Sequence, residues 1–189
     1  MKYYDGKKVY ITGASSGMGF ETAKLLTSWG ADLALFARGG AKLEKTAALA
    51  GVRKKRSGQK ISPIVMDVAD PASVRKAITG ANSMIGAPDI VINFAGVAYS
   101  NHFERIDAAR FDEIMKINVY GTRNVIEAAL PLMKPGSVIA NVASLAGLIG
   151  IYGYTAYGAS KFAVYGMSEC LRYEMKPRGI QVSVLCPPE

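Results

Sequence analysis

The sequence predicts one α/β domain, residues 1–189, built on a doubly wound parallel sheet. Short runs rich in valine, isoleucine and leucine alternate with longer segments of helical periodicity. The apolar runs lack the polar alternation of a strand with one face in water, which indicates a sheet covered on both faces. Half of the 189 residues are apolar, enough to bury one core, and no internal repeat or linker divides the chain.

The strands are expected at the apolar runs. In chain order they are residues 8–12, 33–37, 61–66, 90–94, 138–142 and 182–185. Each is short and bounded by glycine, proline or charged residues, as strands of a parallel sheet usually are.

The helices are expected between these strands. They cover residues 17–29, residues 42–56, a segment that begins at Pro71, residues 111–130 and residues 157–176. Proline is favoured in a first helical turn, and Gly30 and Pro177 mark two helix ends. The 42–56 segment places alanine and leucine on one face and basic residues on the other.

The net charge of +8 is concentrated in the basic run at residues 53–56, with Lys60 close behind. The favoured interpretation is a solvated helix end and loop, and a phosphate-bearing or membrane-surface partner is the alternative. No aromatic residues interleave with the run as a base-stacking platform requires, so no nucleic-acid partner is predicted.

Membrane and metal classes are not favoured. The longest apolar stretch, residues 138–151, is broken by Asn141 and Ser144 and is too short to span a bilayer. The first residues lack the apolar core of a signal peptide. Cys170 and Cys186 have no metal-ligand spacing, so we expect no metal site, no transmembrane segment and a cytoplasmic location.

A glycine-rich turn joins the first strand to the first helix. Glycine there allows a tight turn and lets backbone amides approach a pyrophosphate at the helix N-terminus. This placement predicts a dinucleotide site of the Rossmann type. The turn residues expected to bind the cofactor are Gly13, Ser15, Ser16, Gly17, Met18 and Gly19.

The end of the second strand favours NADP(H). A site for NAD places a carboxylate about twenty residues after the turn to hold the ribose 2′-hydroxyl. This chain has Ala37 followed by Arg38, whose guanidinium can pair with a 2′-phosphate.

Two further strand ends are expected to contact the cofactor. Asp67 and Val68 follow the third strand and can reach the adenine amino group. The segment with Asn93, Ala95 and Gly96 ends the fourth strand and brings backbone near the adenine ribose. Both lie where strand carboxyl ends meet a ligand crevice.

Ser144, Tyr157 and Lys161 indicate chemistry at a carbonyl carbon. The Tyr-x-x-x-Lys spacing occurs three times in the chain, but only Tyr157 starts a helical pattern, where side chains at i and i+4 share a face. The combination with an upstream serine and a dinucleotide turn is typical of a site that moves a hydride and a proton.

Together these motifs resemble the short-chain dehydrogenase/reductases from residue 7 to residue 187. The resemblance implies that Tyr157 is the general acid in carbonyl reduction, helped by the Lys161 cation, which favours the phenolate. It also implies that Tyr157 and Lys161 contact the nicotinamide ribose, that Ser144 holds the substrate oxygen, and that Asn118 anchors a relay water. Pro187 corresponds to a cofactor-contacting proline.

The substrate is expected to be apolar. Residues 145–154 follow Ser144, and Leu148, Ile149, Ile151, Tyr152 and Tyr154 make this segment mainly apolar, although core packing is an alternative. Residues 153–157, 159–163 and 174–177 and the Pro-Pro ending are similar to those of 3-ketodihydrosphingosine reductases, which reduce a long-chain ketone with NADPH. A 3-oxoacyl thioester reductase, a steroid or alcohol dehydrogenase, and a non-catalytic dinucleotide-binding module stay open.

Three smaller expectations complete the sequence-based model. The chain stops soon after the sixth strand and is expected to lack the C-terminal substrate-lid portion of the family. Small residues such as Gly158 and Gly166 on the 157–176 helix predict a homodimer or homotetramer. His102, the only histidine, is expected to be a solvated loop residue.

Overall fold

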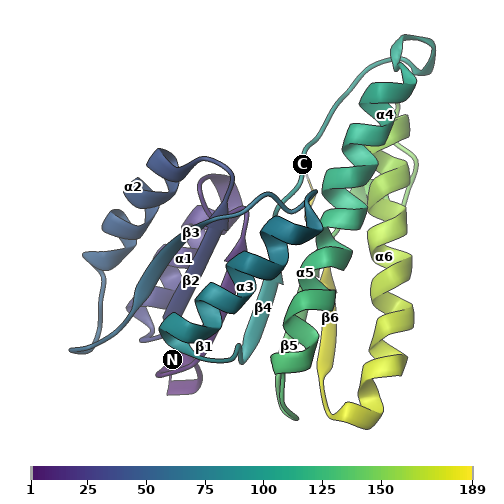
Figure 1. Cartoon of the computed structure of the whole chain (residues 1–189). Helices are drawn as coiled ribbons and strands as arrows, with labels where there is room; N and C mark the ends of the chain where they lie inside the picture. The colour runs from purple at the N-terminus through teal and green to yellow at the C-terminus, as the bar shows by residue number, and fades with distance from the viewer. Residues whose placement is uncertain (1, 189) are drawn as a thin grey trace.

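Six parallel strands form one sheet in the order β3-β2-β1-β4-β5-β6 (Figure 1). The computed structural model describes residues 2–188. The strands are β1 Lys8–Thr12, β2 Asp32–Ala37, β3 Ile61–Val65, β4 Ile90–Asn93, β5 Val138–Val142 and β6 Gln181–Leu185. The order reverses between β1 and β4, so the carboxyl ends of these two strands flank the switch point at which ligands bind in such folds. The predicted doubly wound parallel sheet is confirmed.

Helices cover both faces of the sheet. On one face lie α1 Gly17–Ser28 and α2 Gly40–Gly51, and on the other lie α3 Pro71–Ile85, α4 Ala108–Met115, α5 Gly121–Ala129 and α6 Thr155–Met175. Alternate residues of each strand point to opposite faces. Val9 and Ile11 therefore pack with the α1 side, whereas Tyr10 packs with the α3 side, and all three are fully buried.

The outer strand β3 contains a proline. Pro63 lies beside Leu35 of β2 in the parallel register. A strand interior tolerates proline only where the missing N–H faces away from a partner strand. Pro63 is therefore compatible with β3 because β3 forms the edge of the sheet.

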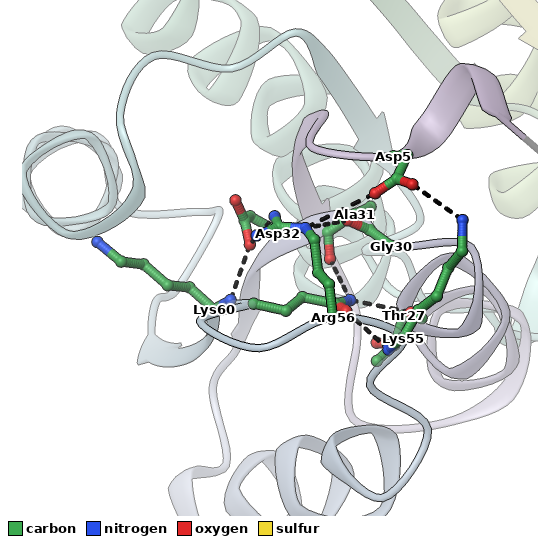
Figure 2. Close-up of polar contacts among 9 residues, drawn as sticks. Asp5, Thr27, Gly30, Ala31, Asp32, Lys55, Arg56 and Lys60 are labelled. Atoms are coloured by element: carbon green, nitrogen blue, oxygen red, sulfur yellow. Dashed lines mark hydrogen bonds and ion pairs between the residues drawn. The ribbon is translucent and has the colours of Figure 1, made fainter.

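The helix predicted over residues 42–56 is wrong at its C-terminal end, because α2 stops at Gly51. The residues after it are held by tertiary contacts instead (Figure 2). Arg56 forms an ion pair with Asp32 at 2.7 Å, and Lys55 forms one with Asp5 at 2.9 Å. The buried Gln59 side chain accepts the Lys55 backbone N–H and donates to two carbonyls around Gly30.

The single helix predicted over residues 111–130 is interrupted. A π-helical turn, η3 Lys116–Tyr120, separates α4 from α5. The side chain of Asn118 is drawn into contacts with Val97 and Ser160, and π turns often occur where a side chain serves such a site. At Gly121 an added Cβ would lie 2.7 Å from Val68, so the helix also approaches the β3–α3 connection closely.

The remaining predicted elements are present with small shifts at their ends. Short 3₁₀ turns at η1 Lys2–Tyr4, η2 Phe103–Arg105, η4 Leu130–Leu132, η5 Leu145–Gly147 and η6 Lys176–Arg178 were not expected from the sequence. Across residues 2–188, no helix combines the length and apolar character needed to cross a bilayer.

Candidate active site

A cleft of about 340 Å³ lies at the carboxyl ends of β1 to β4. We call it the strand-end cleft. Of the residues predicted to bind a cofactor, those that line it are Gly13, Ser15, Ser16, Gly17, Met18, Gly19, Arg38, Asp67, Val68, Ala95 and Gly96. Segments separated by more than eighty residues in the sequence therefore meet at the place that the strand-end motifs predicted.

The glycine-rich turn requires glycine for two different reasons. Gly13 and Gly17 have positive φ angles of 65° and 52°, which other residues rarely adopt. At Gly19 the angle is ordinary, but an added Cβ would lie 2.5 Å from the Gly13 carbonyl oxygen. The turn thus keeps the backbone exposed to the cleft and packs α1 tightly beneath it.

The N-terminus of α1 is suited to an anion. Ser16 is the N-cap residue, yet its side chain makes no capping hydrogen bond, and the first turn contains no acidic residue. The first backbone N–H groups of a helix lack intrahelical partners and carry partial positive charge. The residues of this turn therefore fit the pyrophosphate of a dinucleotide.

The far end of the strand-end cleft carries one cation and one carboxylate. Arg38 is exposed and directly follows β2. Asp67 follows β3, and its Oδ1 accepts the backbone N–H of Ala69 at 2.9 Å, which fixes the orientation of the carboxylate. At the β2 end, the cleft is therefore lined by the Arg38 guanidinium, and Ala37 contributes no carboxylate there.

Asn93, at the end of β4, points away from the strand-end cleft. Its side chain is 3% exposed and donates to Asn141 Oδ1 of the neighbouring strand at 2.9 Å, while its own Oδ1 has no partner within residues 2–188. It does not line the strand-end cleft. The residues that follow it, Phe94, Ala95 and Gly96, do so.

Further cleft-lining residues were not singled out from the sequence. These are Phe36, Met66, Val97 and Ile117. Phe36 and Met66 immediately precede Ala37 and Asp67, so the strand-end rule could have found them. Ile117 could not have been found in this way, because its position depends on the π turn.

Asn118 holds two segments together. Its Nδ2 donates to the Val97 carbonyl and to Ser160 Oγ, both at 2.9 Å, and its Oδ1 accepts the Val97 N–H at 2.8 Å. The residue is 1% exposed. Because Ser160 lies on α6 and Val97 lines the strand-end cleft, this one amide links α6 to the wall of the cleft.

Lys161 is a buried cation. Its side chain points inward from α6, and Nζ donates to the Val142 carbonyl oxygen at 2.9 Å. The residue is 6% exposed, and burial lowers the pKa of its ammonium group to about 8. The same Nζ lies 5.6 Å from the centroid of the Tyr157 ring.

Tyr157 lies in the first turn of α6, half-buried, next to Tyr154 at a centroid distance of 5.5 Å. Ser144 lies two residues after the end of β5 and is 4% exposed, and its side chain accepts the Ala146 N–H at 3.1 Å. We call the residues Asn118, Ser144, Tyr157, Ser160 and Lys161 the Lys161 cluster.

Cys186 was not predicted as a site residue, yet it adjoins the Lys161 cluster. Burial raises the pKa of its thiol, and a hydrogen bond from the Ser144 backbone N–H and the charge of Lys161 act in the opposite direction. Pro187 follows it and accepts the Leu145 N–H at 2.9 Å through its carbonyl. Pro187 thus fixes the segment after Ser144 but does not line the strand-end cleft.

The apolar segment after Ser144 is only partly buried. Leu148, Ile149 and Tyr152 are 44%, 52% and 83% exposed, so they do not belong to the core. Tyr152 stacks edge-on against the exposed His102, with its hydroxyl 3.3 Å from the ring nitrogens. This segment and the loop after β4 therefore form one apolar rim beside the Lys161 cluster.

A family model described as short chain dehydrogenase matches residues 7–189. With the parallel sheet and the glycine-rich turn, this match covers nearly the whole chain. The chain therefore belongs to the short-chain dehydrogenase family.

Among curated proteins, the chain is similar to sphingoid-base reductases. It is 36% identical over 188 residues to a 3-dehydrosphinganine reductase of Danio rerio, covering 98% of this chain and 57% of the relative. It is 34% identical over 187 residues to a 3-ketodihydrosphingosine reductase of Bos taurus, covering 97% and 56%. The chain thus spans a little over half the length of these relatives.

Solved structures agree on the fold. A dehydrogenase/reductase from Sinorhizobium meliloti superposes with a TM-score of 0.91 at 30% identity, over 97% of this chain and 72% of that one. A short chain dehydrogenase/reductase from Burkholderia phymatum, crystallised in complex with NAD, superposes with a TM-score of 0.92 at 28% identity, over 100% and 67%.

Proposed function

We propose that this chain, as one dinucleotide-binding and catalytic unit, reduces a ketone to a secondary alcohol with NADPH. The observation that carries the proposal is the position of Gly96. This residue lines the strand-end cleft, and a Cβ placed there would lie 3.2 Å from Asn118 Oδ1 and 3.5 Å from Lys161 Nζ. A dinucleotide in the cleft would therefore extend directly towards the Lys161 cluster.

Each residue of the Lys161 cluster named below has a separate role in the proposed proton transfer. When bound, NADPH would supply the hydride. Tyr157 Oη donates the proton to the substrate oxygen, and the nearby Lys161 ammonium stabilises the phenolate that remains. Ser144 positions the substrate oxygen, and Asn118 anchors the water through which the proton is replaced.

The choice of NADP(H) rests on the β2 end of the strand-end cleft. Arg38 can form charge-assisted hydrogen bonds with a 2′-phosphate, and Ala37 offers no carboxylate to bind a 2′-hydroxyl. The proposed cofactor contacts also include the Asn93 backbone, Tyr157, Lys161 and Pro187.

The apolar rim supports an apolar, long-chain substrate of the 3-ketosphinganine kind. Leu148, Ile149 and Tyr152 offer exposed apolar surface next to Ser144. The similarity to the 3-dehydrosphinganine reductase of Danio rerio and the 3-ketodihydrosphingosine reductase of Bos taurus supports the same substrate class. A homodimer or homotetramer in a reducing cytoplasm is proposed with it, because Phe162 and Gly166 are exposed on α6 and both cysteines are free thiols.

Calorimetric titration with NADPH and with NADH, followed by a turnover assay, tests the proposal. We expect NADPH to bind more tightly and 3-ketosphinganine to be reduced. Reduction of a 3-oxoacyl thioester or a steroid ketone in its place would retain the mechanism and replace the substrate. Binding of NADPH without turnover of any ketone would indicate a non-catalytic dinucleotide-binding module, and binding of neither nucleotide would overturn the proposal.

A further inference from the structure

The outward side of α2 combines cations with exposed aliphatic side chains. Lys42, Lys45, Leu49 and Val52 follow one another at spacings of three or four residues, so they share one face. Leu49 is 44% exposed and Val52 is 86% exposed. The α2 surface consists of Lys42, Lys45, Leu49, Val52, Arg53 and Lys54.

The cations of the α2 surface differ from those on most other helices. On α1, α4, α5 and α6, a lysine or arginine forms an ion pair with a glutamate three or four residues away. Within residues 2–188, Lys45, Arg53 and Lys54 form no ion pair with a carboxylate. Glu44 is the acidic residue of α2, and it points about 100° away from Lys45 around the helix.

The two halves of the basic run at residues 53–56 make different contacts. Lys55 and Arg56 are turned towards Asp5 and Asp32 and stabilise the fold (Figure 2). Arg53 and Lys54 remain exposed beside the aliphatic side chain of Val52. Arg53 and Lys54 are therefore not used for ion pairs that stabilise the fold.

We propose that the α2 surface docks on an anionic phospholipid membrane. Lysine and arginine near such a surface each strengthen binding about fivefold, and neighbouring aliphatic side chains insert at the headgroup boundary. A single-stranded nucleic acid would instead require aromatic platforms, which the α2 surface lacks. α2 lies beside the outer strand β3, at the opposite end of the sheet from α6 (Figure 1). Docking would thus leave the apolar rim uncovered.

Vesicle sedimentation with the full chain tests the charge component. We expect binding to phosphatidylcholine vesicles that contain about one third phosphatidylserine, and much weaker binding to phosphatidylcholine alone. The double variant Lys45→Glu/Lys54→Glu should bind at least about tenfold more weakly. The control Arg75→Glu/Lys76→Glu changes two exposed residues of α3 and has the same net charge, and its binding should stay within about threefold of the parent.

A second variant tests the apolar component. Leu49→Ser/Val52→Ser leaves the charge unchanged and should still weaken vesicle binding several-fold, with circular dichroism checking that the fold is retained. Equal losses in the α2 and α3 charge variants would overturn the proposal in favour of diffuse attraction. Absence of binding to phosphatidylserine vesicles would overturn it directly. Tight binding of a DNA duplex or RNA hairpin, unaffected by the serine variant, would assign the surface to nucleic acid.

Discussion

The strand-end cleft and the Lys161 cluster are neighbours, but different parts of the chain build them. In the cleft, Gly13, Gly17 and Gly19 act through the absence of side chains, which permits positive φ angles at the first two and close packing of α1 at the third. In the cluster, Asn118 and Lys161 act through buried side chains whose hydrogen bonds go to distant segments. A motif read along the chain describes the first kind of site well, whereas the second depends on tertiary packing.

The largest effect is expected from Tyr157→Phe, which removes one hydroxyl from the Lys161 cluster. Turnover of a ketone should fall about 10²- to 10⁴-fold, because the phenol is the assigned proton donor, while NADPH affinity should change little. Steady-state kinetics and calorimetry measure both. Tyr154→Phe, at the adjacent ring, is the matched control and should retain turnover within a few-fold. Comparable losses in both variants would remove the special role of Tyr157.

A smaller effect is expected from Arg38→Asp in the strand-end cleft. NADPH affinity should fall about tenfold to a hundredfold because a charge-assisted pair with the 2′-phosphate is lost, and NADH affinity should hardly fall. Arg75→Asp makes the same charge change on α3, outside the cleft, and should leave both affinities nearly unchanged. Equal losses for NADPH and NADH would contradict the NADP(H) assignment.

The pH dependence should separate the two regions. Burial lowers the pKa of Lys161 from 10.5 to about 8, so its ammonium group is lost at a lower pH than in an unfolded chain. Turnover should fall about fivefold from pH 8 to pH 9 and about tenfold from pH 9 to pH 10, while NADPH binding through the strand-end cleft should persist. Lys161→Arg keeps its charge, so its alkaline limb should move to higher pH. A flat rate up to pH 10 would show that the Lys161 charge is not required.

The lowered pKa of Lys161 should decrease turnover at alkaline pH but increase the stability of the fold there. Between pH 8 and 10.5 the unfolded chain binds more protons at Lys161 than the folded chain, so this residue raises the free energy of unfolding as pH rises through that window. Urea unfolding of the parent and of Lys161→Met measures the contribution. We expect the rise in the free energy of unfolding with pH to disappear in the variant. If the free energy of unfolding rises with pH as steeply in the variant as in the parent, other groups are responsible.

The smallest effect on turnover is expected from Ser168→Ala, which lies outside the Lys161 cluster. Ser168 is fully buried, accepts the Asn141 side chain at 2.9 Å and donates to the Val164 carbonyl at 2.7 Å. Ser168→Ala should lower the free energy of unfolding by about 1–3 kcal/mol because Asn141 loses a partner, while turnover stays within a few-fold. Ser28→Ala removes an exposed hydrogen bond and should change stability little.

The sequence predicted the fold well because the two-sided burial of parallel strands leaves a strong apolar pattern. Eleven of the residues predicted to bind a cofactor line the strand-end cleft, since strand ends of one parallel sheet meet at one edge. It did not predict the π turn around Asn118 or the end of α2 at Gly51. Both depend on side-chain contacts across the fold, with Val97 and Ser160 in one case and with Asp5 and Asp32 in the other.

The roles within the Lys161 cluster came from resemblance rather than from spacing, and they stay predictions. Spacing alone places Tyr157 and Lys161 on one face of α6. It does not indicate that Lys161 is buried, that its ammonium group reaches Val142, or that Cys186 lies beside it. The Lys161 contact follows from the packing of α6 against β5, and the position of Cys186 follows from the pairing of β5 with β6. No local pattern encodes either arrangement.

Pro63 has a consequence for aggregation. An exposed edge strand offers a row of N–H and C=O groups on which another chain can add a strand, and such growth leads to fibres or amorphous precipitate. The proline in the middle of β3 removes one donor from that row. This edge of the sheet is therefore protected against strand addition while the protein is being synthesised or transiently opened by heat.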